Sequence, residues 1–142
     1  MSLDTKIKNL ELDLFSMGEL VIKNLTEAVK ALETRDVQLA EVVKKKDGEI
    51  DKAYLKIDKD WFELMATEQP VAKDLRLATS IFQASLHLER LGDLSVFLCK
   101  TTKEISDLPI PESLHKIVVE MGYMVIDMSS DAMESLKSKD MD

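Results

Sequence analysis

The sequence predicts an all-α protein: an antiparallel three-helix bundle, running up, down and up, followed by a fourth helix that begins an incomplete second bundle. Three observations predict this fold. Apolar residues recur every three or four positions over long stretches, which is the spacing of one face of an α-helix. Only four glycines and three prolines interrupt the 142 residues. Short breaks near residues 35 and 69 divide the first hundred residues into segments long enough for bundle helices.

The first three helices follow from the apolar stripes and from the residues at their ends. The first helix is expected over about residues 4–34. Asp36 is a suitable N-cap for a second helix over residues 37–67, because its side chain can accept a hydrogen bond from a free backbone N–H. Pro70 suits the first turn of a third helix that continues to about residue 103. Apolar residues lie on two flanks of that third helix, so we expect it to be the most buried element.

The remainder of the chain is expected to form a connector and one more helix. Residues 106–111 cannot continue a helix, because Pro109 and Pro111 lack the backbone N–H that a helix needs. A fourth helix begins near Glu112. The expected organisation is therefore a three-helix bundle over 1–105, the connector, and the first helix of an incomplete second unit over 112–142.

An internal repeat supports this organisation. Residues 121–140 align without a gap on residues 17–36, at a period of 104 residues, with seven identities in 20 positions. The identical pairs are Met17/Met121, Gly18/Gly122, Val21/Val125, Ile22/Ile126, Ala28/Ala132, Leu32/Leu136 and Asp36/Asp140. The fourth helix thus repeats the first, and the chain stops where a second copy of the second helix would begin.

Composition excludes several classes of function. A formal net charge of -8 disfavours nucleic acid and anionic lipid as partners, because both need a basic surface. No stretch reaches the roughly 18 apolar residues of a membrane span, so membrane insertion is not expected. The single cysteine, Cys99, cannot form an internal disulfide and is expected to pack as a small apolar side chain. We expect a cytoplasmic protein.

Four carboxylates occupy positions within the apolar stripes. Asp47 and Asp51 fall inside the stripe of the second helix, and Glu89 and Asp93 fall inside that of the third. Because the two helices are expected to run antiparallel, the two pairs should lie at similar height and face each other, directed toward the core. Such a cluster needs cationic partners, since an uncompensated carboxylate in an apolar setting takes up a proton. The two candidate partners are a metal ion and a salt-bridge network with Lys44, Arg90 and Lys100.

Three motifs resemble those of the PhoU family of phosphate-signalling regulators. They are the run from Gln69 to Arg76 (QPVAKDLR), the run from Glu89 to Asp93 (ERLGD), and the upstream pair Asp47 and Asp51. The resemblance implies tandem three-helix bundles that bind metal ions on a surface of acidic motifs, here Asp47, Asp51, Glu89 and Asp93. It also implies a negative regulator that links the phosphate ABC transporter to a membrane sensor kinase.

The chemistry of the donors leaves the metal open. Oxygen ligands suit Mg, Mn, Ca or Fe, and Zn and Ni also accept carboxylates. A carboxylate-bridged di-metal enzyme of the ferritin-like kind is an alternative, but it usually needs two Glu-x-x-His pairs, and only Glu112 and His115 provide one. A metal-free acidic adaptor is a second alternative. We find no nucleophile and base pair and no phosphate-binding glycine loop, so catalytic residues are not expected and the protein is interpreted as a non-enzyme.

The fourth helix carries an apolar stripe without the two partner helices that cover its counterpart. The stripe consists of Val118, Met121, Val125, Met128, Ala132 and Leu136. An apolar surface of this size should dock on its own bundle or on another chain. The sequence therefore predicts a homodimer through the fourth helix.

Overall fold

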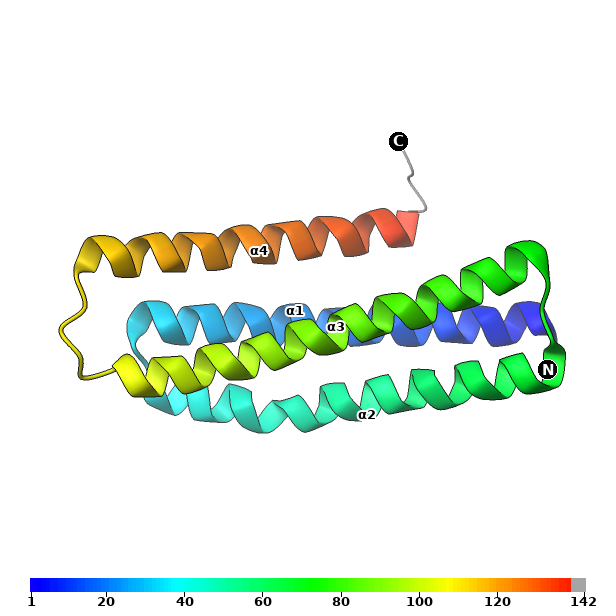
Figure 1. The fold of residues 1–142 in the computed structure, drawn as a ribbon, viewed down its shortest axis with the longest axis horizontal. Coiled ribbons are helices and arrows are strands. Elements are labelled where there is room, and N and C mark those ends of the chain that lie inside the picture. The colour runs from blue at the N-terminus through cyan, green and yellow to red at the C-terminus, as the bar shows by residue number, and fades with distance from the viewer. Residues whose placement is uncertain (139–142) are drawn as a thin grey trace.

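The computed structural model describes residues 1–138 of the chain, and these form four long helices joined by short connections (Figure 1). The helices are α1 (Leu3–Thr34), α2 (Val37–Glu68), α3 (Ala72–Ile105) and α4 (Glu112–Ser138). Successive helices run antiparallel, and α4 lies along the edge of the three-helix bundle (Figure 1). The predicted fold class is confirmed, and each predicted helix end lies within about two residues of the observed one.

Local side-chain chemistry explains where the helices begin and end. The Asp36 carboxylate accepts a hydrogen bond from the backbone N–H of Leu39 at 3.0 Å, so the predicted N-cap of α2 is confirmed. The chain leaves α1 at Arg35 and α2 at Gln69, both in the left-handed conformation that commonly closes a helix. Pro70 is buried and precedes Val71, the N-cap of α3, so the prediction that Pro70 lies in the first turn of the helix is wrong.

The centre of the bundle is α1, which contacts each of the other three helices. Its inward face is fully buried along almost the entire helix, for example at Leu14, Met17 and Val21. The prediction that the third helix would be the most buried element is therefore wrong. The residues that α3 turns to the core are mostly small, which lets its backbone approach the neighbouring helices. They are Ala78, Ile81, Ser85, Leu88, Gly92, Ser95, Cys99 and Thr102.

Among the described helices, α4 makes its close backbone contacts with α1. A glycine of each helix lies opposite an apolar side chain of the other. Gly122 of α4 faces Val29, and Gly18 of α1 faces Met133. These two contacts are equivalent at the repeat period of 104 residues, because Gly122 corresponds to Gly18 and Met133 to Val29. The contact between α1 and α4 is thus approximately two-fold symmetric.

Two polar contacts follow the same symmetry. The Tyr123 hydroxyl donates to the Glu33 carboxylate, and Lys137 Nζ lies 3.4 Å from Glu19 Oε1. Tyr123 is the repeat equivalent of Glu19, and Lys137 that of Glu33. The reciprocal contacts support the repeat, while the division of the chain into one complete and one incomplete unit stays a prediction. The aligned Asp140 lies outside the described residues.

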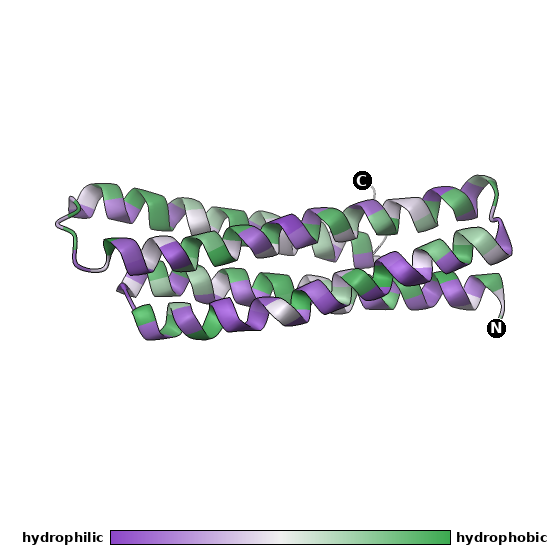
Figure 2. Ribbon diagram, turned by 60° about the horizontal axis from the view of Figure 1, so that its bottom comes forward, coloured by the Kyte–Doolittle hydropathy of each residue, from purple (hydrophilic) through white to green (hydrophobic). Residues whose placement is uncertain are grey.

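Hydrophilic and hydrophobic bands alternate along every helix (Figure 2). This is the pattern of helices that pack one side and expose the other. Within residues 1–138, none of the helices combines the length and the apolar character needed to cross a bilayer.

Candidate metal centre

The four predicted acids lie along the outer seam between α2 and α3, and not in the core. Asp47 and Glu89 are half-buried, whereas Asp51 and Asp93 are exposed. The prediction that all four point into the interior is therefore wrong. The acids of α2 and the acids of α3 nevertheless lie close together, because the two helices run antiparallel and bring them to the same stretch of the seam.

The packing of the two helices explains this position. The residues of α2 that face the core are Ala40, Val43, Ile50, Ile57 and Leu64. Asp47 and Asp51 are turned from that line by a fraction of a helical turn, since each residue advances about 100° around the axis. The apolar stripe of α2 is wider than the row of residues that the bundle buries, and the acids lie at the edge of the stripe, outside that row.

Three carboxylates are close enough to share one cation. One oxygen from each of Asp47, Asp51 and Asp93 lies within 4.8 Å of the other two. Three carboxylate oxygens this close together can reach one cation, and oxygen donors suit a hard ion such as Ca²⁺ or Mg²⁺. Glu89 is not part of this group of three, but its carboxyl lies close enough to that of Asp93 for a proton to be shared between them when one is protonated.

The electrostatics of the seam show an excess of negative charge. Burial raises the pKa of Asp47 above its ordinary value, and repulsion from Asp51 and Asp93 raises it further. Burial likewise raises the pKa of Glu89, followed by its hydrogen bond with Asp93 and by repulsion from the other acids. A cation placed among these groups would favour their ionised forms and reverse both shifts.

The structure does not contain the alternative salt-bridge network. None of the ion pairs formed within residues 1–138 joins Lys44, Arg90 or Lys100 to the four acids. The lysines that do form ion pairs on α2, Lys46 and Lys56, turn toward acids of α1. The seam therefore carries several negative charges without a protein cation in contact.

Aromatic side chains continue the same seam toward the connection between α2 and α3. The rings of Trp61 and Phe82 stack across the two helices at 4.5 Å, and Phe62 meets Trp61 edge-on at 5.4 Å. Trp61 is half-buried against the core, whereas Phe62 is exposed. Sequence reasoning did not pair Trp61 with Phe82. The signal was present, because Trp61 follows the acids of α2 and Phe82 precedes those of α3, both at helical spacing.

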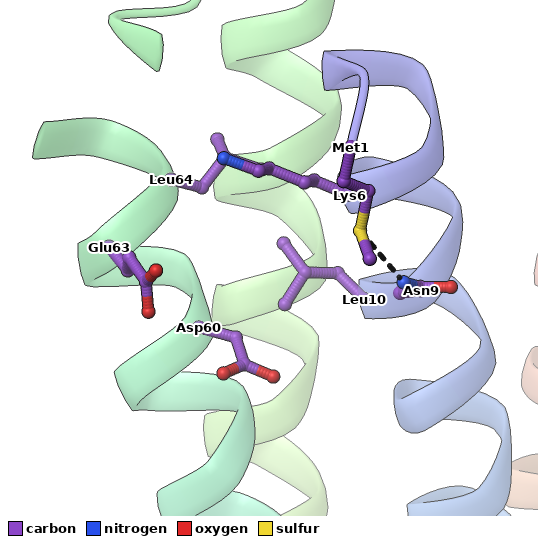
Figure 3. A pocket seen from close by; sticks show the side chains of 7 residues that line it. All are labelled: Met1, Lys6, Asn9, Leu10, Asp60, Glu63 and Leu64. Atoms are coloured by element: carbon purple, nitrogen blue, oxygen red, sulfur yellow. Dashed lines mark hydrogen bonds between the residues drawn. The ribbon is translucent and has the colours of Figure 1, made fainter. Parts of the chain in front are cut away.

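A cleft elsewhere in the bundle does not coincide with the acids. It has a volume of about 290 Å³ and lies between the start of α1 and the end of α2 (Figure 3). Lys6, Asn9, Asp60 and Glu63 line it, together with apolar residues. The Lys6 amine already pairs with Glu68 at 2.5 Å, so the lysine of the cleft is engaged.

Comparison with known proteins decides the family. The family profile described as "PhoU domain" matches residues 14–102, which is more than half of the chain and includes both acidic motifs. The chain belongs to the PhoU family. The family resemblance that the three sequence motifs suggested is thereby confirmed.

The most similar relatives carry names from phosphate transport. The chain is 30% identical over 142 residues to the phosphate-specific transport system accessory protein PhoU of Serratia marcescens. It is 33% identical over 143 aligned positions to a PhoU homolog of Clostridium acetobutylicum and 28% identical to PhoU of Escherichia coli. These alignments cover 98% of this chain but only 57%, 64% and 57% of the relatives. The chain thus spans less than two thirds of their length.

The membership also bears on the enzyme alternative. The relatives in this family are named as accessory proteins of transport and not as enzymes. The one Glu-x-x-His pair does not join the acids, because His115 Nε2 lies 3.1 Å from the carbonyl oxygen of Glu33 at the contact between α1 and α4. His115 thus helps to seat α4, and Glu112 is exposed.

Proposed function

We propose that this PhoU-family chain is a negative regulator of phosphate uptake and phosphate signalling, acting in the cytoplasm by contact with other proteins. The proposed partners are the phosphate ABC transporter and its sensor kinase. The proposed contact surface is the seam of α2 and α3, with a metal ion held by Asp47, Asp51 and Asp93 and with Glu89 beside it. Family membership and the relatives' printed role in phosphate transport support this assignment.

The observation that carries the proposal is the group of three carboxylates without a protein counter-charge. Asp47, Asp51 and Asp93 come from two helices and lie within reach of one ion. Burial, and then repulsion from Asp51 and Asp93, raise the pKa of Asp47, so the ionised, metal-free seam is electrostatically unfavourable. A divalent cation would remove that repulsion and hold α2 and α3 together at mid-length. The bound ion would supply positive charge and open coordination positions at a surface that is otherwise acidic.

The aromatic residues beside the acids suit a protein partner. Large aromatic side chains next to a charged site are typical anchors of protein interfaces. Phe62 is exposed, and it rests on Trp61, which is held in place by Phe82. Trp61 is the single tryptophan of the chain. Its fluorescence therefore reports directly on whether a partner covers this end of the seam.

The first experiment measures metal. The chain is purified, stripped with a chelator and titrated separately with Mg, Ca, Mn, Fe(II), Zn and Ni, and binding is followed by calorimetry and by the shift in unfolding temperature. We expect at least one of these ions to bind and to raise the unfolding temperature. The variant Asp51→Asn with Asp93→Asn should abolish both effects.

The matched control is Glu49→Gln. Glu49 is an exposed acid of the same stretch of α2, between Asp47 and Asp51, but it is not one of the grouped carboxylates. This variant should bind metal like the unmodified chain. Equal loss of binding in the control and in the double variant would mean diffuse attraction to an acidic surface. Absence of binding by all six ions would contradict the metal site and favour the metal-free acidic adaptor.

The second experiment measures regulation. A bacterium that lacks its own PhoU protein carries a reporter driven by phosphate starvation, and the chain is expressed in it. We expect reduced reporter activity in phosphate-rich medium, little reduction with Asp51→Asn and Asp93→Asn, and normal reduction with Glu49→Gln. Full repression by the double variant would show that regulation does not require the acids.

A further inference from the structure

Gly92 is a buried residue of α3 that lies beside the three grouped carboxylates. It directly precedes Asp93 in the chain, and it faces Asp47 and Ile50 of α2. A β-carbon on Gly92 would lie 3.2 Å from Cγ2 of Ile50, 3.5 Å from Cδ1 of the same residue and 3.5 Å from Oδ1 of Asp47. The absence of a side chain at residue 92 therefore lets α2 approach α3 closely at the height of the acids.

The backbone conformation does not require a glycine at this position. None of the glycines has a positive φ, and Gly92 lies in the interior of α3. Glycine inside a helix is less favourable than alanine, because it loses more conformational freedom on folding. Packing explains the glycine instead. The other glycine beside the acids, Gly48, differs in this respect, since a β-carbon there would have no atom within 4 Å.

The close approach at Gly92 sets how far apart the carboxylates of the two helices lie. Ile50 lies within one helical turn of Asp47 and Asp51, the two acids that α2 contributes to the group. A methyl group at residue 92 would require Ile50 to give way by a few tenths of an ångström. Ile50 is 1% exposed and β-branched, so its side chain has little freedom to turn aside. The backbone of α2 would have to shift, and it would carry both acids away from Asp93.

A shift of this size is comparable to the difference in size between metal ions. Bonds from oxygen ligands are about 2.0–2.1 Å long for Mg²⁺ and about 2.0–2.2 Å for Zn²⁺, but about 2.3–2.6 Å for Ca²⁺. Mg²⁺ also demands a nearly ideal geometry, whereas Ca²⁺ accepts a flexible one. Carboxylates that lie farther apart should therefore lose affinity for the small ions more than for Ca²⁺.

We infer that Gly92 determines the size of the ion that the seam of α2 and α3 accepts. Gly92 has no side chain with which to bind the ion, so it is a positioning residue that acts through Ile50 and the backbone of α2. The inference rests on the proposed metal site and adds the residue that makes the site selective. The contact belongs to the three-helix bundle and involves neither α4 nor the end of the chain.

Calorimetric titration of the chelator-stripped chain with Mg, Ca, Mn, Fe(II), Zn and Ni tests the inference. Gly92→Ala should lower the affinity for the small ions, such as Mg²⁺ and Zn²⁺, by roughly tenfold and the affinity for Ca²⁺ by less. Adding Ile50→Leu to this variant removes the methyl group nearest to residue 92 and should restore the affinities. Circular dichroism and urea unfolding establish that each variant is folded.

The matched control is Gly48→Ala, which adds the same methyl group beside the same acids but in open space. Its affinities should equal those of the unmodified chain. Unchanged affinities in Gly92→Ala, or an equal loss for small and large ions, would overturn the inference and leave Gly92 a packing residue only. A chain that binds none of the six ions would overturn the proposed metal site, and the inference with it.

Discussion

The contact between α1 and α4 makes a sharp prediction for Gly122→Ala. A β-carbon on Gly122 would lie 2.8 Å from one methyl of Val29 and 2.9 Å from the other, and real β-carbons do not approach other atoms so closely. Val29 is fully buried and its β-branched side chain has little rotational freedom, so it cannot move aside. Relief of this clash requires α4 to lift from α1.

Two opposing effects set the magnitude. Overpacking of a buried contact costs about 1–3 kcal/mol. Replacing glycine by alanine inside a helix gains about 1 kcal/mol. The free energy of unfolding should therefore fall by up to about 2 kcal/mol. Gly48→Ala is the control, because a β-carbon there has no atom within 4 Å and keeps only the helical gain, a rise of about 1 kcal/mol.

Urea unfolding measures both variants, and hydrogen exchange resolves where the change lies. Gly122→Ala should speed exchange of the α4 amides while leaving those of α2 unchanged. Gly18→Ala should have a smaller effect, because the group that it meets is the flexible end of Met133. The reasoning is refuted if Gly122→Ala stabilises the chain as much as Gly48→Ala does and α4 keeps its protection.

Four further outcomes are expected. In metal-free protein, Asp51→Asn should raise the free energy of unfolding at pH 7, because it removes a charge that raises the pKa of Asp47 and Glu89. A carboxyl whose pKa is raised in the folded state lowers the free energy of unfolding at any pH above that raised pKa. The benefit of the variant should therefore fade as the pH falls through the raised values toward the ordinary values of 3.8 for Asp47 and 4.5 for Glu89. Unfolding curves at several pH values measure this loss. Burial raises the pKa of the Cys99 thiol to about 11, so an aromatic disulfide reagent at pH 8 should react roughly a hundredfold more slowly than with a free thiol until urea unfolds the chain. His115→Ala removes the contact with the Glu33 carbonyl and should destabilise α4 by about 1 kcal/mol, measured by hydrogen exchange, with metal binding unchanged; loss of metal would instead support the di-metal enzyme. Asp36→Ala should lower the free energy of unfolding by about 1 kcal/mol in urea, since the Leu39 N–H loses its acceptor, and an unchanged midpoint would contradict the capping role.

Local sequence determined the helices and their limits. Apolar spacing set each helix, because a period near 3.6 residues is a property of a single helix and needs no knowledge of its neighbours. Asp36 set the start of α2 for an equally local reason, because its side chain accepts a hydrogen bond from a free backbone N–H. The meeting of Asp47 with Asp93 was also predictable, since a short connection makes α2 and α3 antiparallel.

Other features of the site depended on how the helices pack. A sequence stripe shows which residues share a side of a helix, but it does not show which part of that side touches a neighbour. The acids therefore seemed to face the core, whereas packing left Asp51 and Asp93 in solvent. For the same reason the sequence wrongly favoured α3 over α1 as the most buried helix, because each is apolar over a wide sector.

The position of α4 shows most clearly which features the sequence determines and which features the packing decides. Its sequence determined an amphipathic helix that repeats α1 and that has more apolar surface than one neighbour can cover. Only the tertiary structure decided which part is used, because close approach at Gly18 and Gly122 requires the right partner side chains at the same height. Periodicity is fixed within one helix, whereas burial is a relation between helices, and only their packing determines it.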